Sequence, residues 1–297
     1  MPLPLVLDTD IGDDIDDALA LAVALNSPEL SLVGVTTVFR DAPRRTLLVR
    51  ELLRGWNRDD VPVYAGASQP LLTDLATMPY GGASVGKQFE ALDSALQAPP
   101  TEHAALFLVE QIRAHHARGE VLTIVPIGAL TNIALAFALA PDVATQCRLV
   151  LMGGLWGQTP GGERYAEWNI LCDPEAAAMV FRSGADTTMV GLDVTLQCVL
   201  SDDEVARFRQ ANTPRAAFLA DLIALWGHPV TLHDPLTVLT LFSELVTFEP
   251  KRIEVELYGK ERAWTRVGEG APNCRVGVSV EAERAKAEFL ERVLRAS

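Results

Sequence analysis

Six aspartates fall within ten residues near the start of the chain, where a short apolar run gives way to an acidic one. They are Asp8, Asp10, Asp13, Asp14, Asp16 and Asp17. One or two carboxylates favour a helix N-terminus, but six would repel one another strongly without a cation among them. Oxygen ligands with no neighbouring His or Cys indicate a hard divalent ion, calcium or magnesium. The spacing is not that of an EF-hand. The structural alternative is a solvated acidic turn that caps a helix.

An aspartate pair of the form Asp-x-Asp after a first strand also begins phosphotransferases that form an aspartyl-phosphate. That chemistry needs a lysine near the phosphate, and the lysines here are few. None of them ends a convincing strand: Lys87, Lys251, Lys260 and Lys286. The sequence therefore favours a metal site without phosphoryl transfer.

The elements that must position the aspartates alternate between strands and helices. Apolar runs predict strands at residues 4–7, 30–38, 61–65, 121–127, 148–152 and 187–190. Amphipathic patterns predict helices at residues 16–26, 43–55, 102–118, 132–139 and 235–245. Asp173-Pro174-Glu175 and the capping box Ser201–Glu204 begin two more. This alternation predicts an α/β fold with an open, mostly parallel central sheet flanked by helices. Ligands bind such sheets at the carboxyl ends of the strands.

The whole chain, residues 1–297, is expected to form one domain, because the alternation resumes after the irregular stretches at residues 68–100 and 157–167. The net charge of -14 argues against nucleic acid or an anionic membrane as a partner. No signal peptide and no apolar stretch of about 18 residues are visible. The four cysteines are widely spaced, as in a reducing cytosol: Cys147, Cys172, Cys198 and Cys274. We expect a cytoplasmic protein.

The run DTDIGDDIDDALAL, residues 8–21, resembles the N-terminal signature of the inosine–uridine-preferring nucleoside hydrolase family. Further blocks resemble the family in the same order, at residues 35–38, 127–135, 152–154, 166–169, 173–177, 191–195 and 232–236. The resemblance implies a Rossmann-like core and an enzyme that splits the N-glycosidic bond of ribonucleosides with water. It also implies an essential Ca²⁺, a small nucleoside substrate, and a homodimer or homotetramer.

The resemblance implies a set of metal ligands: Asp10, Asp17, the backbone carbonyl of Thr131, and Asp234. Asp10 would also be the general base that takes a proton from the attacking water. Two of these residues have plain structural alternatives. Asp234 could cap a helix beginning at Pro235, and Thr131 with Asn132 could form an ordinary N-cap.

The resemblance also implies substrate contacts. Asp16 would accept a hydrogen bond from a ribose hydroxyl, with Asp8 supporting the metal shell. The other substrate-binding candidates are Asp41, Met152, Glu167, Trp168 and Asn169. Glu167 and Asn169 could instead be ordinary loop residues. His233 could protonate the departing base or only pack, and Trp226 and His228 lie on a segment that approaches the base in relatives.

The chain departs from the family pattern in several places. Ile11 replaces a proline, and two extra residues make Asp13 and Asp14 loop residues. Arg40-Asp41 stands where relatives often have Gly-Asn. The segment of residues 80–87 lacks the usual His-Gly-x-x-Gly-Leu pattern, and Leu196 stands where many have histidine. These changes leave two alternatives open: hydrolysis of another N-ribosyl compound, and calcium-dependent binding of a nucleoside or ribose without turnover.

Overall fold

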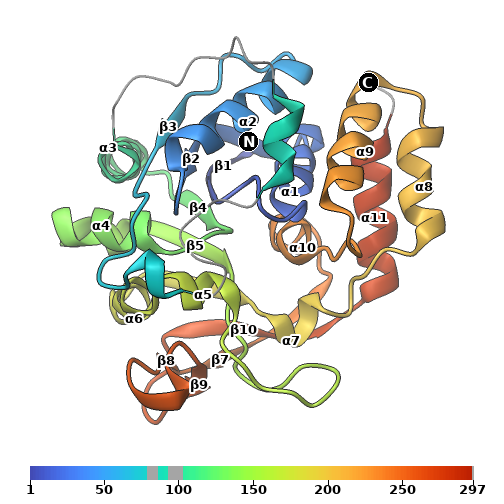
Figure 1. Ribbon diagram of the computed structural model, residues 1–297. Helices are drawn as coiled ribbons and strands as arrows, with labels where there is room; N and C mark the ends of the chain where they lie inside the picture. Colours follow the sequence, from blue (N-terminus) through green and yellow to red (C-terminus); the bar gives the residue numbers. More distant parts are fainter. Residues whose placement is uncertain (79–85, 93–102, 296–297) are drawn as a thin grey trace.

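The strands of the computed structural model form one large sheet and one small one (Figure 1). The structure describes residues 1–78, 86–92 and 103–295, so most of the segment at residues 80–87 lies outside it. The large sheet has the order β3-β2-β1-β4-β5-β6-β10-β7 and is parallel except for the pair β10 and β7. Its strands are β1 (Leu3–Thr9), β2 (Leu30–Thr37), β3 (Val63–Ala65), β4 (Leu122–Pro126), β5 (Cys147–Met152), β6 (Asp186–Val190), β7 (Val246–Lys251) and β10 (Cys274–Val280). An antiparallel pair, β8 (Ile253–Val255) and β9 (Thr265–Val267), stands apart.

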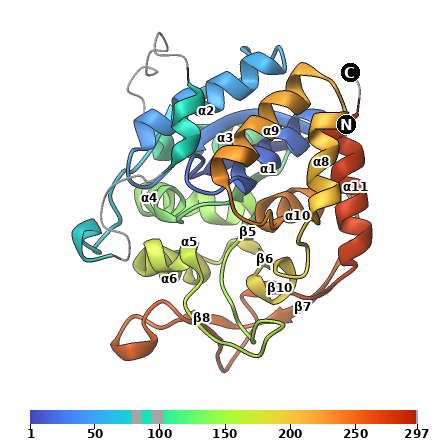
Figure 2. The ribbon, with the colours of Figure 1, turned by 45° about the vertical axis from the view of Figure 1, so that its right-hand side comes forward.

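Helices cover both faces of the large sheet (Figures 1 and 2). The α-helices are α1 (Asp16–Asn26), α2 (Ala42–Gly55), α3 (Ala104–Ala117), α4 (Thr131–Leu139), α5 (Trp168–Cys172), α6 (Pro174–Arg182), α7 (Leu192–Thr195), α8 (Asp202–Gln210), α9 (Pro214–Trp226), α10 (His233–Leu239) and α11 (Ala282–Leu294). Short 3-10 helices are η1 (Leu75–Thr77), η2 (Lys87–Ala91), η3 (Pro141–Gln146) and η4 (Gly259–Glu261). The predicted fold class is confirmed.

The side chains of β1 show why this strand lies in the middle of the sheet. Leu5 and Leu7 belong to one apolar cluster together with α1, α2 and α8 to α11, while Val6 belongs to another with α3, α4 and α6. A parallel strand covered on both faces reads as a nearly continuous apolar run, as this one does. The strand therefore delivers the acidic loop that follows it to the centre of the sheet's carboxyl edge.

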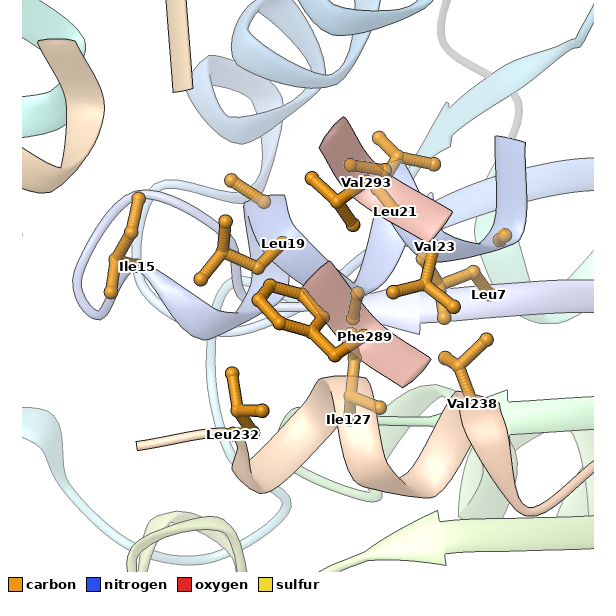
Figure 3. Close-up of a cluster of buried hydrophobic side chains, with 14 of the residues drawn as sticks. Leu7, Ile15, Leu19, Leu21, Val23, Ile127, Leu232, Val238, Phe289 and Val293 are labelled. Carbon is orange, nitrogen blue, oxygen red and sulfur yellow. The ribbon is translucent and has the colours of Figure 1, made fainter. Parts of the chain in front are cut away.

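Helix α1 is anchored on its apolar side. Figure 3 shows Leu19 of α1, Phe289 of α11 and Val238 of α10 within one cluster of buried side chains. Each is fully buried. Burying a side chain of this size contributes roughly 1.5–3 kcal/mol. This packing fixes where the acidic first turn of α1 points.

Most predicted elements are found within one to three residues of their predicted ends. Asp173 caps α6, and the capping box of Ser201 and Glu204 opens α8, as predicted. The helix predicted at residues 235–245 is wrong in extent, because α10 runs from His233 to Leu239 and the chain then turns to enter β7. No helix among the described residues is long and apolar enough to cross a membrane. The single domain stays a prediction.

Candidate active site

The acidic loop of residues 10–15 joins β1 to α1 at the carboxyl edge of the sheet. Asp16 and Asp17 follow it in the first turn of α1, and they are only 5% and 3% exposed. The N-cap residue Ile15 forms no side-chain capping bond. The carboxylates of a solvated acidic turn would be exposed to water. For Asp16 and Asp17 the alternative of a solvated acidic turn is therefore wrong.

Helix α10 brings a third carboxylate to the same point from the far end of the sequence. Asp234 lies in the first turn of α10 and is 2% exposed. Its backbone N–H donates to Asp16 Oδ2 at 3.4 Å. The N-cap residue of α10 is Leu232, so Asp234 is not the cap of this helix. Its carboxylate belongs to the acidic cluster instead.

Carboxylate oxygens of Asp16, Asp17 and Asp234 all lie within 4.8 Å of one another. Burial raises the pKa of each carboxyl well above its usual value, and repulsion from neighbouring aspartates raises it further. Three carboxylates buried this close together repel one another strongly, and the nearby charge of Arg45 offsets this only in part, at Asp17. A divalent cation would offset this cost. The donor set is all oxygen, which fits calcium or magnesium better than zinc.

Asp8, near the end of β1, is a further buried carboxyl behind the acidic loop. Its Oδ1 accepts hydrogen bonds from Thr36 Oγ1 at 2.5 Å and from Asn132 Nδ2 at 2.7 Å. Its Oδ2 is buried and has no hydrogen-bond partner among the described residues. Burial raises the pKa of this carboxyl to about 7. An unpaired buried acceptor costs roughly 1–3 kcal/mol, so the residues present fit a bound cation.

Asp10 lies against the end of β4. A Cβ placed on Gly128 would lie 2.8 Å from Asp10 Oδ1, so a larger residue there would displace the carboxylate. Ile127, the residue directly after β4, lines the same cavity as Asp10. Burial raises the pKa of Asp10 to about 7, although the charge of Arg45 opposes this rise. Its carboxylate therefore lies within the cavity, where it could accept a proton from a bound ligand or water.

The prediction for Thr131 as a metal ligand is not supported by its position. Thr131 lies in the first turn of α4, outside the cavity lining, and its Oγ1 donates to Asp173 Oδ2 at 2.7 Å. Leu130 is the N-cap of α4 and makes no side-chain cap, so the expected Thr131–Asn132 cap is also wrong. Ile127, the first residue after β4, lines the cavity instead.

Another part of the cavity lining comes from α5 and the end of β5. Glu167 is the N-cap of α5 and accepts hydrogen bonds from the backbone N–H groups of Asn169, Ile170 and Gly154. Asn169 Nδ2 donates to the carbonyl of Ile127 at 3.0 Å and to that of Met152 at 3.2 Å. These bonds join the ends of β4 and β5. Glu167 and Asn169 are therefore built into the wall and are not loose loop residues.

The assembled cavity has a volume of about 730 Å³, within the usual range for small-molecule sites. Its lining is acidic at the floor and aromatic at the rim. The lining residues are Asp10, Asp13, Asp14, Asp16, Asp17, Arg40, Ile127, Met152, Tyr165, Ala166, Glu167, Trp168, Asn169, Leu192, Trp226, His228, His233 and Asp234.

A sequence model of the family described as inosine-uridine preferring nucleoside hydrolase matches residues 5–287. The chain belongs to this family. It is an N-glycosyl hydrolase, as predicted.

Individual relatives of this nucleoside hydrolase differ in the bases their names give. A protein of Enterobacter sp. (strain 638) named pyrimidine-specific ribonucleoside hydrolase RihA is 38% identical, over 88% of this chain and 86% of that protein. Its namesake in Shewanella oneidensis is 35% identical, over 90% of this chain and 83% of that protein. A solved structure named purine-preferring ribonucleoside hydrolase, from Gardnerella vaginalis, is 31% identical with a TM-score of 0.84, over 98% of each chain.

His233 stands beside the acidic cluster of this nucleoside hydrolase and lines the cavity. Its Nδ1 is 2.7 Å from Thr195 Oγ1, the last residue of α7. Burial lowers the pKa of the ring to about 4, so the imidazole is neutral at pH 7. A neutral ring held by a hydroxyl can offer its other nitrogen to a ligand as a hydrogen-bond donor.

Asp41 lies elsewhere than the sequence predicted. It is exposed, does not belong to the cavity lining, and caps α2 by accepting a hydrogen bond from Arg44 N–H at 3.3 Å. The neighbouring Arg40 lines the cavity instead. The backbone explains why Arg40, and not Asp41, faces the cavity. Phe39 and Arg40 both have positive φ, which turns the chain so that the Asp41 side chain points to solvent.

Replacing Asp41 with alanine is expected to lower stability by about 0.5–1 kcal/mol through loss of the cap, and to leave KM unchanged. Urea unfolding and a substrate titration of the variant measure both quantities. A clear rise in KM without loss of stability would restore Asp41 as a sugar contact.

Nothing in the sequence indicates a role in the site for Arg45 or Tyr165, whereas Arg40 and Asp14 stand out only as departures from the family pattern. Arg40 is buried with its Cζ 5.5 Å from the Trp168 ring centre. Arg45 is fully buried beneath the acidic loop. Tyr165 lines the cavity mouth and is 42% exposed. Asp14 lines the cavity and is partly buried, which raises its pKa to about 6.

Proposed function

We propose that this protein hydrolyses the N-glycosidic bond of ribonucleosides, releasing ribose and a free base, and that it requires calcium. The observation that carries the proposal is the buried cluster of Asp16, Asp17 and Asp234 at the floor of a cavity of nucleoside size. We assign Asp10, Asp17, Asp234 and the carbonyl of Ile127 as calcium ligands, with Ile127 in place of Thr131. Calcium accepts six to eight oxygen ligands in irregular geometry, which suits carboxylates from three separate segments.

The reaction can be written with this chain's own groups. The C1′–N bond breaks as a C1′–O bond forms to water, and Asp10 accepts the proton that the water loses. The base leaves with the electron pair of the C1′–N bond, and its nitrogen takes up a proton to give the free base. When bound, the cation supplies positive charge that acidifies water and orients the ribose hydroxyls. Asp16 accepts a hydrogen bond from a ribose hydroxyl. The carboxylates at the cavity floor also stabilise the positive charge that develops on the sugar.

The sugar and the base would occupy different ends of the cavity. Glu167, Trp168, Asn169 and Met152 also line the cavity, and we assign them to the ribose. Trp226 and His228 form an edge-on pair at the rim, with ring centres 4.9 Å apart, which suits a flat base. The relatives with 35–38% identity support pyrimidine ribonucleosides as the preferred substrates. The homodimer or homotetramer and the cytoplasmic location stay predictions.

A second candidate function is hydrolysis of another N-ribosyl compound. It is favoured by Arg40, a cavity-lining cation where relatives often have glycine. Binding without turnover is disfavoured, because each predicted catalytic carboxylate is present in the cavity.

His233→Ala is expected to lower kcat for natural nucleosides by about 10–100-fold, because the departing base loses a hydrogen-bond donor. The loss should be much smaller with p-nitrophenyl riboside, whose leaving group needs no proton. Ribose release from both substrates measures the difference. Equal losses on both substrates would show that His233 only packs.

The direct test is release of free ribose from a panel of purine and pyrimidine ribonucleosides, with added calcium and after chelation. Calcium-dependent release, fastest from uridine or cytidine, is the expected result. No release from folded, calcium-loaded protein would overturn the proposal and turn attention to other N-ribosyl substrates. Release that survives complete metal removal would overturn the calcium requirement alone.

A further inference from the structure

A guanidinium group lies buried directly beneath the acidic loop. It belongs to Arg45, in the first turn of α2, whose side chain is 0% exposed. The other arginines of α2 resemble it in the sequence, so nothing in the pattern sets it apart. Burying a cation completely is costly in free energy unless nearly all of its N–H donors form hydrogen bonds.

Arg45 uses four of its five N–H donors. Nη1 donates to the carbonyl oxygens of Asp10 and Ile11, the latter at 2.8 Å. Nε donates to the carbonyl of Phe39 at 2.9 Å, and Nη2 donates to Asp13 Oδ2 at 2.9 Å. We call Arg45 and these four acceptors the arginine clamp.

The clamp joins two loops that leave neighbouring strands. Asp10, Ile11 and Asp13 follow β1, whereas Phe39 follows β2. Phe39 has a φ of 69°, a left-handed conformation that costs a non-glycine residue energy. The planar fork of arginine can serve separated acceptors in fixed directions, which the single ammonium of lysine cannot.

We propose that Arg45 is a positioning residue: by holding the Asp10 and Ile11 carbonyls, the clamp fixes the direction in which the acidic loop presents Asp10 and the start of α1 to the cavity. The inference rests on the proposed function, because it assigns Arg45 to the support of the calcium ligands. Loss of groups that orient metal ligands typically weakens metal affinity 10–100-fold.

The test compares R45K and R45Q with R54K and R54Q. Arg54 lies on the same helix but is 52% exposed and pairs only with Glu51 among the contacts described. The calcium concentration that gives half of the maximal rise in Tm should increase about tenfold in R45K and about a hundredfold in R45Q. At saturating calcium, kcat should fall more than KM rises. Both Arg54 variants should match the wild type.

A purely structural role predicts a different pattern. In that case R45K would lower the Tm in chelator, while its calcium midpoint and kcat would equal those of R54K, and the proposal would be overturned. Should R45Q fail to fold, D13N removes the one charged acceptor of the clamp and should shift the calcium midpoint in the same direction by less. If calcium does not change the Tm of the wild type, the calcium requirement is overturned. The kcat of R45K compared with that of R54K would then decide the role of Arg45. A wild type that releases no ribose leaves the calcium midpoints to decide it.

Discussion

Asp10→Asn is expected to lower kcat by roughly 10³-fold or more while the protein stays folded. A positioned general base typically contributes 10²–10⁴-fold, and this residue is also assigned as a calcium ligand. Asparagine keeps the shape of the side chain but cannot accept a proton at neutral pH. Ribose release at saturating calcium and nucleoside measures the loss.

The same substitution should make the metal-free protein more stable. The charge of Asp10 raises the pKa of Asp16, Asp17 and Asp234 by repulsion. Removing that charge therefore reduces the electrostatic repulsion within the cluster. Residues needed for function often lower the stability of the folded protein, as these repelling carboxylates do. A rise in Tm in chelator together with a fall in kcat would separate a functional carboxylate from a structural one.

The matched control is Asp142→Asn, an exposed carboxylate of η3 that pairs with Arg113 outside the cavity. It should change neither kcat nor the metal-free Tm appreciably, since exposed ion pairs contribute little. Turnover of Asp10→Asn equal to that of this control would remove Asp10 from the mechanism. The role of base would then pass to another floor carboxylate.

The sequence predicts the cluster of cavity aspartates well, because both the residue types and the positions of the strand ends can be recognised in it. The first helix is predicted with its observed ends, and Asp10, Asp16, Asp17 and Asp234 do meet at one edge of the sheet. Parallel strands bring their carboxyl ends together whatever the length of chain between them. The motif blocks and their order along the chain are therefore enough to predict which residues come together at this edge of the sheet.

The remaining errors share a physical origin. A main-chain ligand has no side-chain signature, so the sequence alone does not distinguish Thr131 from Ile127, the residue after β4 that lines the cavity. The direction of the Asp41 side chain depends on the positive φ of Phe39 and Arg40. Non-glycine residues rarely adopt such angles, and their residue types do not predict it. The burial of Arg45 depends on acceptors in two loops that only the fold brings together. Backbone direction and long-range hydrogen bonds thus set the limit of prediction here.

The metal-free protein is expected to lose stability as the pH rises from about 4 to 7. Burial raises the pKa of Asp8 and Asp10 to about 7 in the folded chain, whereas an unfolded aspartate has a pKa of about 3.9. The folded state therefore holds protons that the unfolded state has lost, and this contribution to stability is complete below about pH 4 and disappears as the pH passes about 7. Each such carboxyl changes the free energy of unfolding by about 1.4 kcal/mol per pH unit between these limits.

Calcium should reverse this trend, because it binds the ionised carboxylates and competes with protons. At a concentration a hundred times its Kd, a cation that binds only the folded state contributes about 2.7 kcal/mol. The rise in Tm on adding calcium should thus be small at pH 5 and several degrees at pH 8. Thermal unfolding in chelator and in calcium at each pH measures it, with Asp234→Asn as the variant in which the rise should largely vanish. A calcium effect that is the same at every pH, or that Asp234→Asn retains in full, would mean that the cation binds somewhere other than the buried cluster.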